Sequence, residues 1–173
     1  QKEKYLPKIV NGEITTALAV DESSHHDPSK TSLTAEKNKD NYILNGKKTF
    51  VRDGASADVL IVLTRTSGNS GELAGLTLCI IDSSADGLDK IKLDMADSRN
   101  YANINFNDVK CSNQDILGTL ETGGETVESI LDIGRIAISA EMLGNAESAF
   151  ETTIEYLKQR KQFGVLIGTF QAL

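Results

Sequence analysis

Two short stretches of the sequence hold side chains whose types and spacing could do chemistry. His25 and His26 precede Asp27, which places two imidazoles beside a carboxylate. A two-histidine metal site needs further ligands at a fitting spacing, and none is apparent, so we expect a solvated loop and no metal. Asp132 and Arg135 are spaced i, i+3, which puts them on one face of a helix, either as an exposed ion pair or as a ligand contact.

A third stretch combines basic and aromatic residues. Lys158, Arg160 and Lys161 precede Phe163 and Gly164. Cations near the end of a helix suit its dipole, so this pattern on its own favours a basic helix C-terminus that ends at Gly164. An aromatic residue earlier in the chain, at position 50, is on its own a candidate for a core strand.

The composition limits the function classes. The chain has 173 residues, 39% of them hydrophobic and 25% charged, as in an ordinary globular protein of one domain with a core. A net charge of −7 argues against a nucleic-acid surface. No run of about eighteen apolar residues predicts a membrane span, and no targeting leader is visible. Cys79 and Cys111 do not suggest a disulfide framework, so we expect a reducing, cytoplasmic location.

The elements that must position these residues differ between the two halves of the chain. Residues 13–117 contain short runs rich in β-branched and aromatic residues, separated by turn signals. Asn45-Gly46 is the strongest of these signals and predicts a type I′ hairpin turn, with further turns at Asp53-Gly54 and Asp86-Gly87. About seven or eight antiparallel strands would form a small barrel or sandwich. The runs are ITTALAV, TSLTAEK, NYIL, KKTFV, DVLIVLTR, GLTLCIID and YANINF.

After Gly123-Gly124 the pattern becomes helical over about 50 Å. A stripe of apolar residues falls on roughly one helical face. A helix of this length cannot bury its stripe against one small β-domain, so either the chain oligomerises or its helical partners lie outside this sequence. The fold class is therefore α+β. The stripe comprises Val127, Leu131, Ile138, Met142, Ala146, Phe150 and Leu157.

Four stretches in order resemble the acyl-CoA dehydrogenase family. YLKQRKQFGVLIGTFQAL resembles its R-x-x-F-G-x-x-I-x-x-x-Q-A signature, YILNGKKTFVRDGASADVLIVLTRT its Asn-Gly-x-Lys segment, and YANINFNDVKCSNQDILG its last β-hairpin. QKEKYLPKIVNGEITTALAVDE resembles the entry to its middle domain. The resemblance implies the end of an N-terminal helical domain at 1–12, a middle β-domain at 13–118, and the first helix and start of the second of a truncated four-helix bundle at 119–173.

The resemblance also implies an FAD site. The family's Thr-Glu-Pro-x-x-Gly-Ser-Asp corresponds to residues 20–27, where only Asp27 matches strictly, and its Trp-Ile-Thr corresponds to residues 50–52. Arg52 thus replaces a hydroxyl and adds a cation. In the family, Arg160, Gln162 and Phe163 reach the FAD of a neighbouring subunit, where a guanidinium suits the pyrophosphate. The residues implied to bind the cofactor are Ala19, Val20, His25, His26, Phe50, Val51, Arg52, Arg160, Gln162, Phe163, Phe170 and Gln171.

For the substrate, the resemblance implies an acyl-CoA thioester contacted by His26, Asp132 and Arg135. The implied reaction is α,β-dehydrogenation, in which a carboxylate takes the α-proton and the β-hydride passes to the flavin. The family's base is a late Glu beyond Leu173 or, in one branch, a residue at the position of Gly134, so we expect no catalytic residue in this chain. An electron-transfer flavoprotein as acceptor and a homodimer or homotetramer would follow.

Three alternatives remain open from the sequence. The chain could belong to a non-catalytic partner subunit without FAD, as the unusual Val20, Glu22, His26 and Arg52 would allow. It could belong to a related flavin oxidase, which shares the architecture. It could also be an unrelated β-domain with a dimerising helix.

Overall fold

A computed structural model describes residues 1–170 and divides the chain into two units, Gln1–Glu128 and Ser129–Leu173, which we treat separately. Gln171 lies outside the described residues. The first unit begins with α1 (Lys2–Val10) and then forms an eight-stranded sheet in the order β6-β7-β3-β2-β4-β5-β8, with β1 paired to β4. The strands are β1 (Thr16–Ala19), β2 (Thr34–Asn38), β3 (Asn41–Arg52), β4 (Val59–Arg65), β5 (Leu76–Asp82), β6 (Leu88–Asp94), β7 (Asn100–Ser112) and β8 (Ile116–Leu117).

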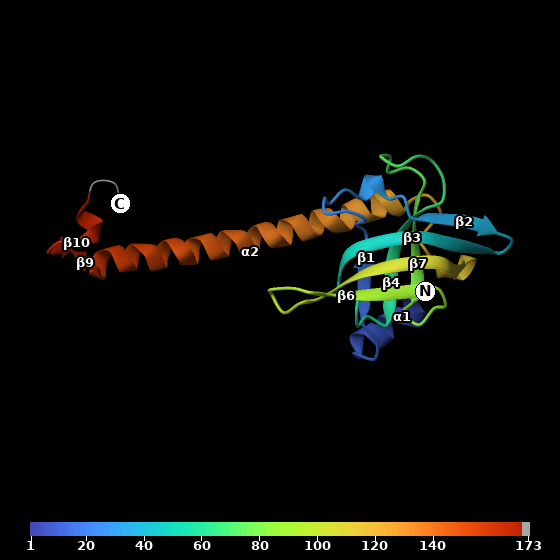
Figure 1. The fold of residues 1–173 in the computed structure, drawn as a ribbon, viewed down its shortest axis with the longest axis horizontal. Helices are drawn as coiled ribbons and strands as arrows, with labels where there is room; N and C mark the ends of the chain where they lie inside the picture. The colour runs from blue at the N-terminus through green and yellow to red at the C-terminus, as the bar shows by residue number, and fades with distance from the viewer. Residues whose placement is uncertain (171–173) are drawn as a thin grey trace. The chain divides into compact units, whose positions relative to one another are not determined.

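The predicted α+β class is confirmed, with one refinement in the pairing. Most neighbouring strands are antiparallel, and the long strands β3 and β7 run side by side through the sheet (Figure 1). Two pairs, β1 with β4 and β2 with β4, are parallel, so the sheet is mixed. Strand β6 was not predicted, because its few apolar residues are separated by charged ones and it is at most half-buried. Two 3₁₀ turns, Pro28–Lys30 and Asn113–Asp115, complete this unit.

The predicted turn at Asn45-Gly46 is wrong. Both residues lie inside β3, at a register shift opposite β7, and the hairpin between β2 and β3 turns instead at residues 39–40. Gly46 has φ +141°, and a Cβ built on it would lie 2.9 Å from the Cα of Leu33. The Asn45 side chain bonds to Asp108 in β7, accepting from its backbone N–H at 2.8 Å. The Asn-Gly pair therefore forms a bulge with a close backbone approach.

The hydrophobic core is one cluster of buried residues contributed by the strands of this sheet. Its largest apolar side chains are almost completely buried, and each contributes roughly 1.5–3 kcal/mol of transfer free energy. Cys79 and Cys111 are both buried free thiols in this core. The hydrogen bond with Cys79, together with burial, raises the pKa of the Cys111 thiol. Core residues include Leu33, Leu44, Leu60, Val62, Ile104, Phe106 and Val109.

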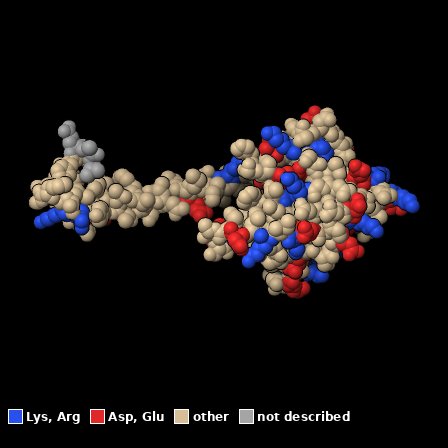
Figure 2. Space-filling model, in the orientation of Figure 1, with Lys and Arg blue, Asp and Glu red and all other residues tan. Residues whose placement is uncertain are grey.

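The second unit carries most of α2 (Gly123–Gln159), followed by a short hairpin of β9 (Lys161–Gln162) and β10 (Val165–Leu166) and a 3₁₀ turn, Ile167–Thr169. The predicted long helix is confirmed in type, but its apolar residues are not confined to one face. Ile133 and Ile136 lie off the predicted stripe, and they are 70% and 73% exposed. Apolar side chains therefore occur on more than one face of the helix. On the face that Figure 2 shows, few charged side chains lie along α2, although the helix also holds Glu141, Glu147 and Glu151. A helix that is apolar on several sides is typical of a buried helix.

Within the part of the chain that the structure describes, no helix is both long enough and apolar enough to cross a membrane.

Candidate functional site

The two segments predicted to contact a flavin lie side by side. We call residues 19–27 and 48–52 the paired segments. The Thr49 backbone N–H donates to the Asp21 carbonyl at 2.7 Å, and its hydroxyl donates to the Ser23 carbonyl at 3.3 Å. Lys48 Nζ donates to the Val20 carbonyl at 2.8 Å. Residues more than twenty positions apart in the sequence thus form one continuous surface.

A buried ion pair lies beneath this surface. Lys48 Nζ is 2.8 Å from Glu22 Oε1, and the Lys48 side chain is fully buried while that of Glu22 is 13% exposed. Burial lowers the pKa of Lys48 to about 8, although Glu22 acts in the opposite direction. Burial also acts to raise the pKa of Glu22, but Lys48 and donors from Ser32 and Leu33 outweigh it, so the pKa is lowered. Both groups are therefore charged near neutral pH.

The histidines differ in their contacts. His26 Nδ1 lies 2.9 Å from Asp21 Oδ1, so the Asp21 carboxylate fixes the orientation of the ring and leaves Nε2 available to a ligand. His25 is exposed. Asp27 caps the turn at Pro28, accepting from the Ser29 hydroxyl at 2.6 Å, and this contact lowers its pKa. Among the described residues no group of three or more His, Cys, Asp or Glu side chains could hold a metal.

The second paired segment presents an aromatic ring. Phe50 is 51% exposed and has φ +50°, so it is not the core strand residue that its type alone suggested. Its backbone N–H donates to Asn103 Oδ1 at 3.2 Å. Arg52 is exposed, with Nε 3.9 Å from Asp53 Oδ2. Ala19 and Val51 are buried as whole residues, at 0% and 2% exposed, so both lie behind the exposed Phe50 ring.

A polar cavity adjoins the paired segments. It encloses about 290 Å³ and is lined by hydroxyls, two carboxylates, one histidine and one lysine. The hydroxyl of Thr31 in its wall is buried without a hydrogen-bond partner among the described residues. The lining residues are Val20, Glu22, Ser23, His25, Asp27, Lys30, Thr31, Ser32 and Ser70.

Arg65 holds two walls of this cavity together. It is 8% exposed, and its guanidinium donates only to backbone carbonyls. Nε bonds to Thr31 at 2.8 Å, Nη2 to Ser29 at 2.9 Å and to Glu72 at 2.8 Å. Nη1 bonds to Ser67 at 3.2 Å and to Ala74 at 3.1 Å. One side chain therefore fixes the 29–31 turn against the loop at 66–75.

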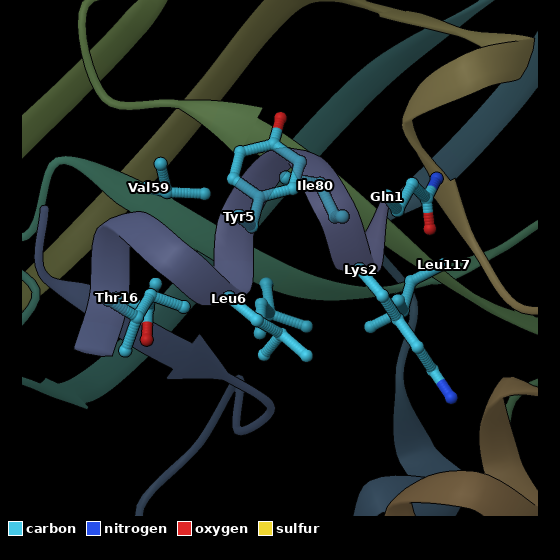
Figure 3. A pocket seen from close by; sticks show the side chains of 10 residues that line it. Gln1, Lys2, Tyr5, Leu6, Thr16, Val59, Ile80 and Leu117 are labelled. Carbon is cyan, nitrogen blue, oxygen red and sulfur yellow. The ribbon is translucent and has the colours of Figure 1, made fainter. Parts of the chain in front are cut away.

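A second cavity of about 270 Å³ is apolar and lies between α1 and the sheet. Figure 3 shows Tyr5 and Leu6 of α1 beside Val59 and Ile80 of the sheet. It shares no lining residue with the polar cavity and contains no cluster of titratable groups. It therefore does not extend the candidate site.

The predicted site residues of the second unit are exposed. Arg135 Nη1 donates to Asp132 Oδ1 at 2.6 Å, so the pair forms the ion pair that its spacing predicts. Arg160 follows the last residue of α2, and Gln162 lies in β9. Phe163 is 93% exposed.

No helix ends at Gly164, although the basic pattern taken alone would favour one there. Phe163 and Gly164 both have positive φ, 53° and 82°, and form the turn between β9 and β10. This geometry matches a two-residue hairpin loop, which a helical C-terminus would not give. Phe170 follows the 3₁₀ turn, donating its backbone N–H to Ile167 at 3.2 Å. The hairpin holds Phe163 in solvent at its tip.

Sequence reasoning assigned no role to Lys48, Thr49 or Arg65. Lys48 stands in a strand between polar residues, where nothing in the pattern distinguishes a buried lysine from an exposed one. Arg65 ends an apolar run, DVLIVLTR, and a charge after such a run is ordinarily solvated. Only the pairing of distant segments reveals that both cations are buried.

Comparisons with known proteins agree on the family. Residues 17–109 match the model of the acyl-CoA dehydrogenase middle domain, and residues 121–173 match that of the acyl-CoA dehydrogenase C-terminal domain. The chain is 38% identical over 178 aligned positions to a 3-(aryl)acrylate reductase from Clostridium sporogenes, covering 100% of this chain and 47% of that protein. It is 37% identical to the mitochondrial isovaleryl-CoA dehydrogenase of Pongo abelii, covering 100% of this chain and 42% of that protein.

Two further similar proteins are a subunit of a complex with Etf and a structure solved with FAD. The CarC subunit of the caffeyl-CoA reductase–Etf complex from Acetobacterium woodii is 32% identical, with 100% of this chain and 46% of that protein covered. The solved FAD complex of PigA superposes with a TM-score of 0.88 at 31% identity, over 99% of this chain and 45% of that one. The chain thus spans about half the length of the curated relatives it matches.

Proposed function

Because the chain belongs to the acyl-CoA dehydrogenase family, we propose that it forms the β-domain and first bundle helix of an FAD-dependent enzyme acting on the Cα–Cβ bond of acyl-CoA thioesters. The observation that carries the proposal is the contact between the paired segments. The Thr49–Asp21 backbone bond, 2.7 Å long, aligns the two stretches that the resemblance assigns to the flavin. The exposed aromatic ring of Phe50 beside this contact suits a planar heterocycle.

The residues of this chain would hold the cofactor in two places. Phe50 would lie against the ring, with Ala19, Val20 and Val51 packed behind it, while His25, His26 and Arg52 would lie at its polar edge. Arg52 offers a cation where most of the family offers a hydroxyl, which favours an electron-rich state of a bound ring. Arg160, Gln162 and Phe163, with Phe170 and Gln171 after them, would reach the cofactor of a neighbouring subunit.

Substrate contacts would come from three residues. His26, oriented by Asp21, would present Nε2 to the thioester region. Asp132 and Arg135 would contact the acyl-CoA from α2, where their ion pair is exposed and therefore costs little to rearrange. When bound, FAD supplies the hydride-accepting chemistry. No residue of this chain is proposed as the base that takes the α-proton.

The direction of the reaction is a second question. Two relatives carry the names of reductases, of 3-(aryl)acrylate and of caffeyl-CoA, whereas the mitochondrial relative is named a dehydrogenase. An α,β-unsaturated aryl substrate reduced with electrons from an electron-transfer flavoprotein is thus a specific alternative to oxidation of a saturated acyl-CoA. A homodimer or homotetramer would bring the Arg160 hairpin of one subunit to the cofactor of another.

A non-catalytic subunit without FAD, or a related flavin oxidase, would share this fold. The altered flavin motif at Glu22, His26 and Arg52 is the observation that keeps these alternatives in view.

The test is to purify the protein encoded by the complete gene and record its absorption spectrum. We expect a flavin band and its bleaching by an acyl-CoA, or reoxidation of the reduced flavin by an arylacrylyl thioester. A colourless protein that takes up no added FAD would contradict the proposal. Direct consumption of oxygen by the reduced protein at the rate of turnover would favour the oxidase.

A further inference from the structure

The Glu22 carboxylate joins three separate parts of the first unit. Its Oε1 accepts from the Leu33 backbone N–H at 2.9 Å and from Lys48 Nζ at 2.8 Å. Its Oε2 accepts from the Ser32 backbone N–H at 2.8 Å and from the Ser32 hydroxyl at 2.5 Å. The residues just before β2, strand β3 and the first paired segment therefore meet at one anion.

Lys48 completes this network from β3. Its side chain is fully buried, and Nζ donates to the Val20 carbonyl as well as to Glu22. Both contacts are made to the first paired segment. The next residue, Thr49, donates its backbone N–H to Asp21 of the same segment. Three successive residues of one segment, 20–22, are thus held by two successive residues of the other.

We propose that Glu22 and Lys48 are positioning residues, which hold the first paired segment in the conformation that receives the flavin and make flavin affinity depend on the protonation of Lys48. This inference rests on the proposed function, because it concerns the same surface. Neither residue is proposed to touch the reacting atoms. The function of the pair is to fix the backbone of residues 20–22 against β3, beside the exposed Phe50 ring.

Loss of the Lys48 proton would weaken this arrangement for an electrostatic reason. The charged groups that act on Lys48 are Glu22 and Asp21, which favour its protonated form, and Arg65, which disfavours it. Asp21 is itself engaged with His26. Once Lys48 is neutral, the buried Glu22 carboxylate has no neutralising cation and retains only neutral donors. An unpaired buried charge is costly, so the segment would rearrange toward water.

The pH range over which FAD affinity should change follows from the pKa of Lys48. The pKa of Lys48 is lowered to about 8, chiefly by burial. If only the protonated form receives the flavin, the dissociation constant for FAD should be about tenfold larger near pH 9 than near pH 7. The Glu22→Gln variant should show a much shallower dependence of FAD affinity on pH, because it removes the buried carboxylate that a neutral Lys48 would leave without a cation.

The experiment measures the FAD dissociation constant of the protein from the complete gene across this pH range. Four proteins are compared: wild type, Glu22→Gln, Lys48→Arg and, as a matched control, Lys47→Met, whose side chain is exposed on the same strand. A guanidinium does not titrate here, so Lys48→Arg should flatten the profile, and Lys47→Met should follow wild type. If Lys48→Arg does not fold, Glu22→Gln decides the matter alone.

Hydrogen exchange gives a readout that needs no flavin. The amides of Leu33 and Thr49 should lose protection above about pH 8 in wild type but keep it in Lys48→Arg, after correction for intrinsic exchange. FAD binding that is unchanged by pH in wild type, or a pH dependence in Glu22→Gln as steep as that of wild type, overturns this inference alone. Absence of FAD binding at every pH overturns the proposed function and the flavin part of the inference together.

Discussion

Replacing Arg65 by lysine tests whether the polar cavity is held together by one guanidinium. Arg65 makes five bonds to backbone carbonyls, from Ser29, Thr31, Ser67, Glu72 and Ala74. A lysine ammonium has three donors and no fork, so at least two carbonyls lose their partner. A buried unsatisfied group costs about 1–3 kcal/mol, and partial access of water to the loop reduces this, so we expect a loss of about 2–3 kcal/mol.

The assay is equilibrium unfolding in urea, with the free energy of unfolding compared between variants. Arg99→Lys serves as the control, because Arg99 is exposed in the loop between β6 and β7 and should change stability by less than about 0.5 kcal/mol. Hydrogen exchange should show the loss of protection concentrated in residues 66–75. A cost for Arg65→Lys equal to that of Arg99→Lys would refute the argument, since it would mean that the five contacts contribute nothing net.

Three further outcomes follow from single residues. The pKa of Glu22 is lowered, so its contribution to stability is present above its ordinary pKa and is lost as pH falls through the lowered value. The free energy of unfolding of Glu22→Gln, followed by circular dichroism, should therefore fall less steeply with decreasing pH than that of wild type. Gly46→Ala should cost about 1–3 kcal/mol in urea unfolding, since φ +141° and the Leu33 backbone both oppose a side chain, and an unchanged midpoint would refute the bulge. Phe163→Ala should leave stability within about 0.5 kcal/mol, because the ring is 93% exposed, but should reduce the flavin retained on purification if the hairpin contacts a cofactor.

Much of the fold follows from local sequence patterns. Short runs rich in β-branched residues, bounded by turn signals, located β4 and β5, and the apolar periodicity after Gly123-Gly124 located α2. The error at Asn45-Gly46 has a tertiary cause. The dipeptide permits a turn, but contacts with Leu33 and Asp108 instead make it a bulge within a strand. Strand β6 escaped notice because its pairing with β7 supplies an order that its own residues do not signal.

The resemblance named the two segments of the candidate site, but the sequence did not indicate the buried side chains that hold them together. Resemblance placed Phe50 and His26 in two stretches, and the structure brings those stretches together through Thr49. The ion pair of Lys48 with Glu22 joins residues 26 positions apart, and no local propensity indicates which of several lysines will be buried. Partners of this kind are fixed by long-range strand pairing, which a single sequence does not display.

The most direct measurement is the absorption spectrum and flavin content of the purified protein, for wild type beside Phe50→Ala. Our account predicts a bound flavin in wild type and a reduced flavin content in Phe50→Ala, with the β-sheet circular dichroism unchanged because that ring is half exposed. A wild-type protein that folds and yet binds no FAD, or a Phe50→Ala variant with undiminished flavin, would contradict the claim that the paired segments are the flavin surface.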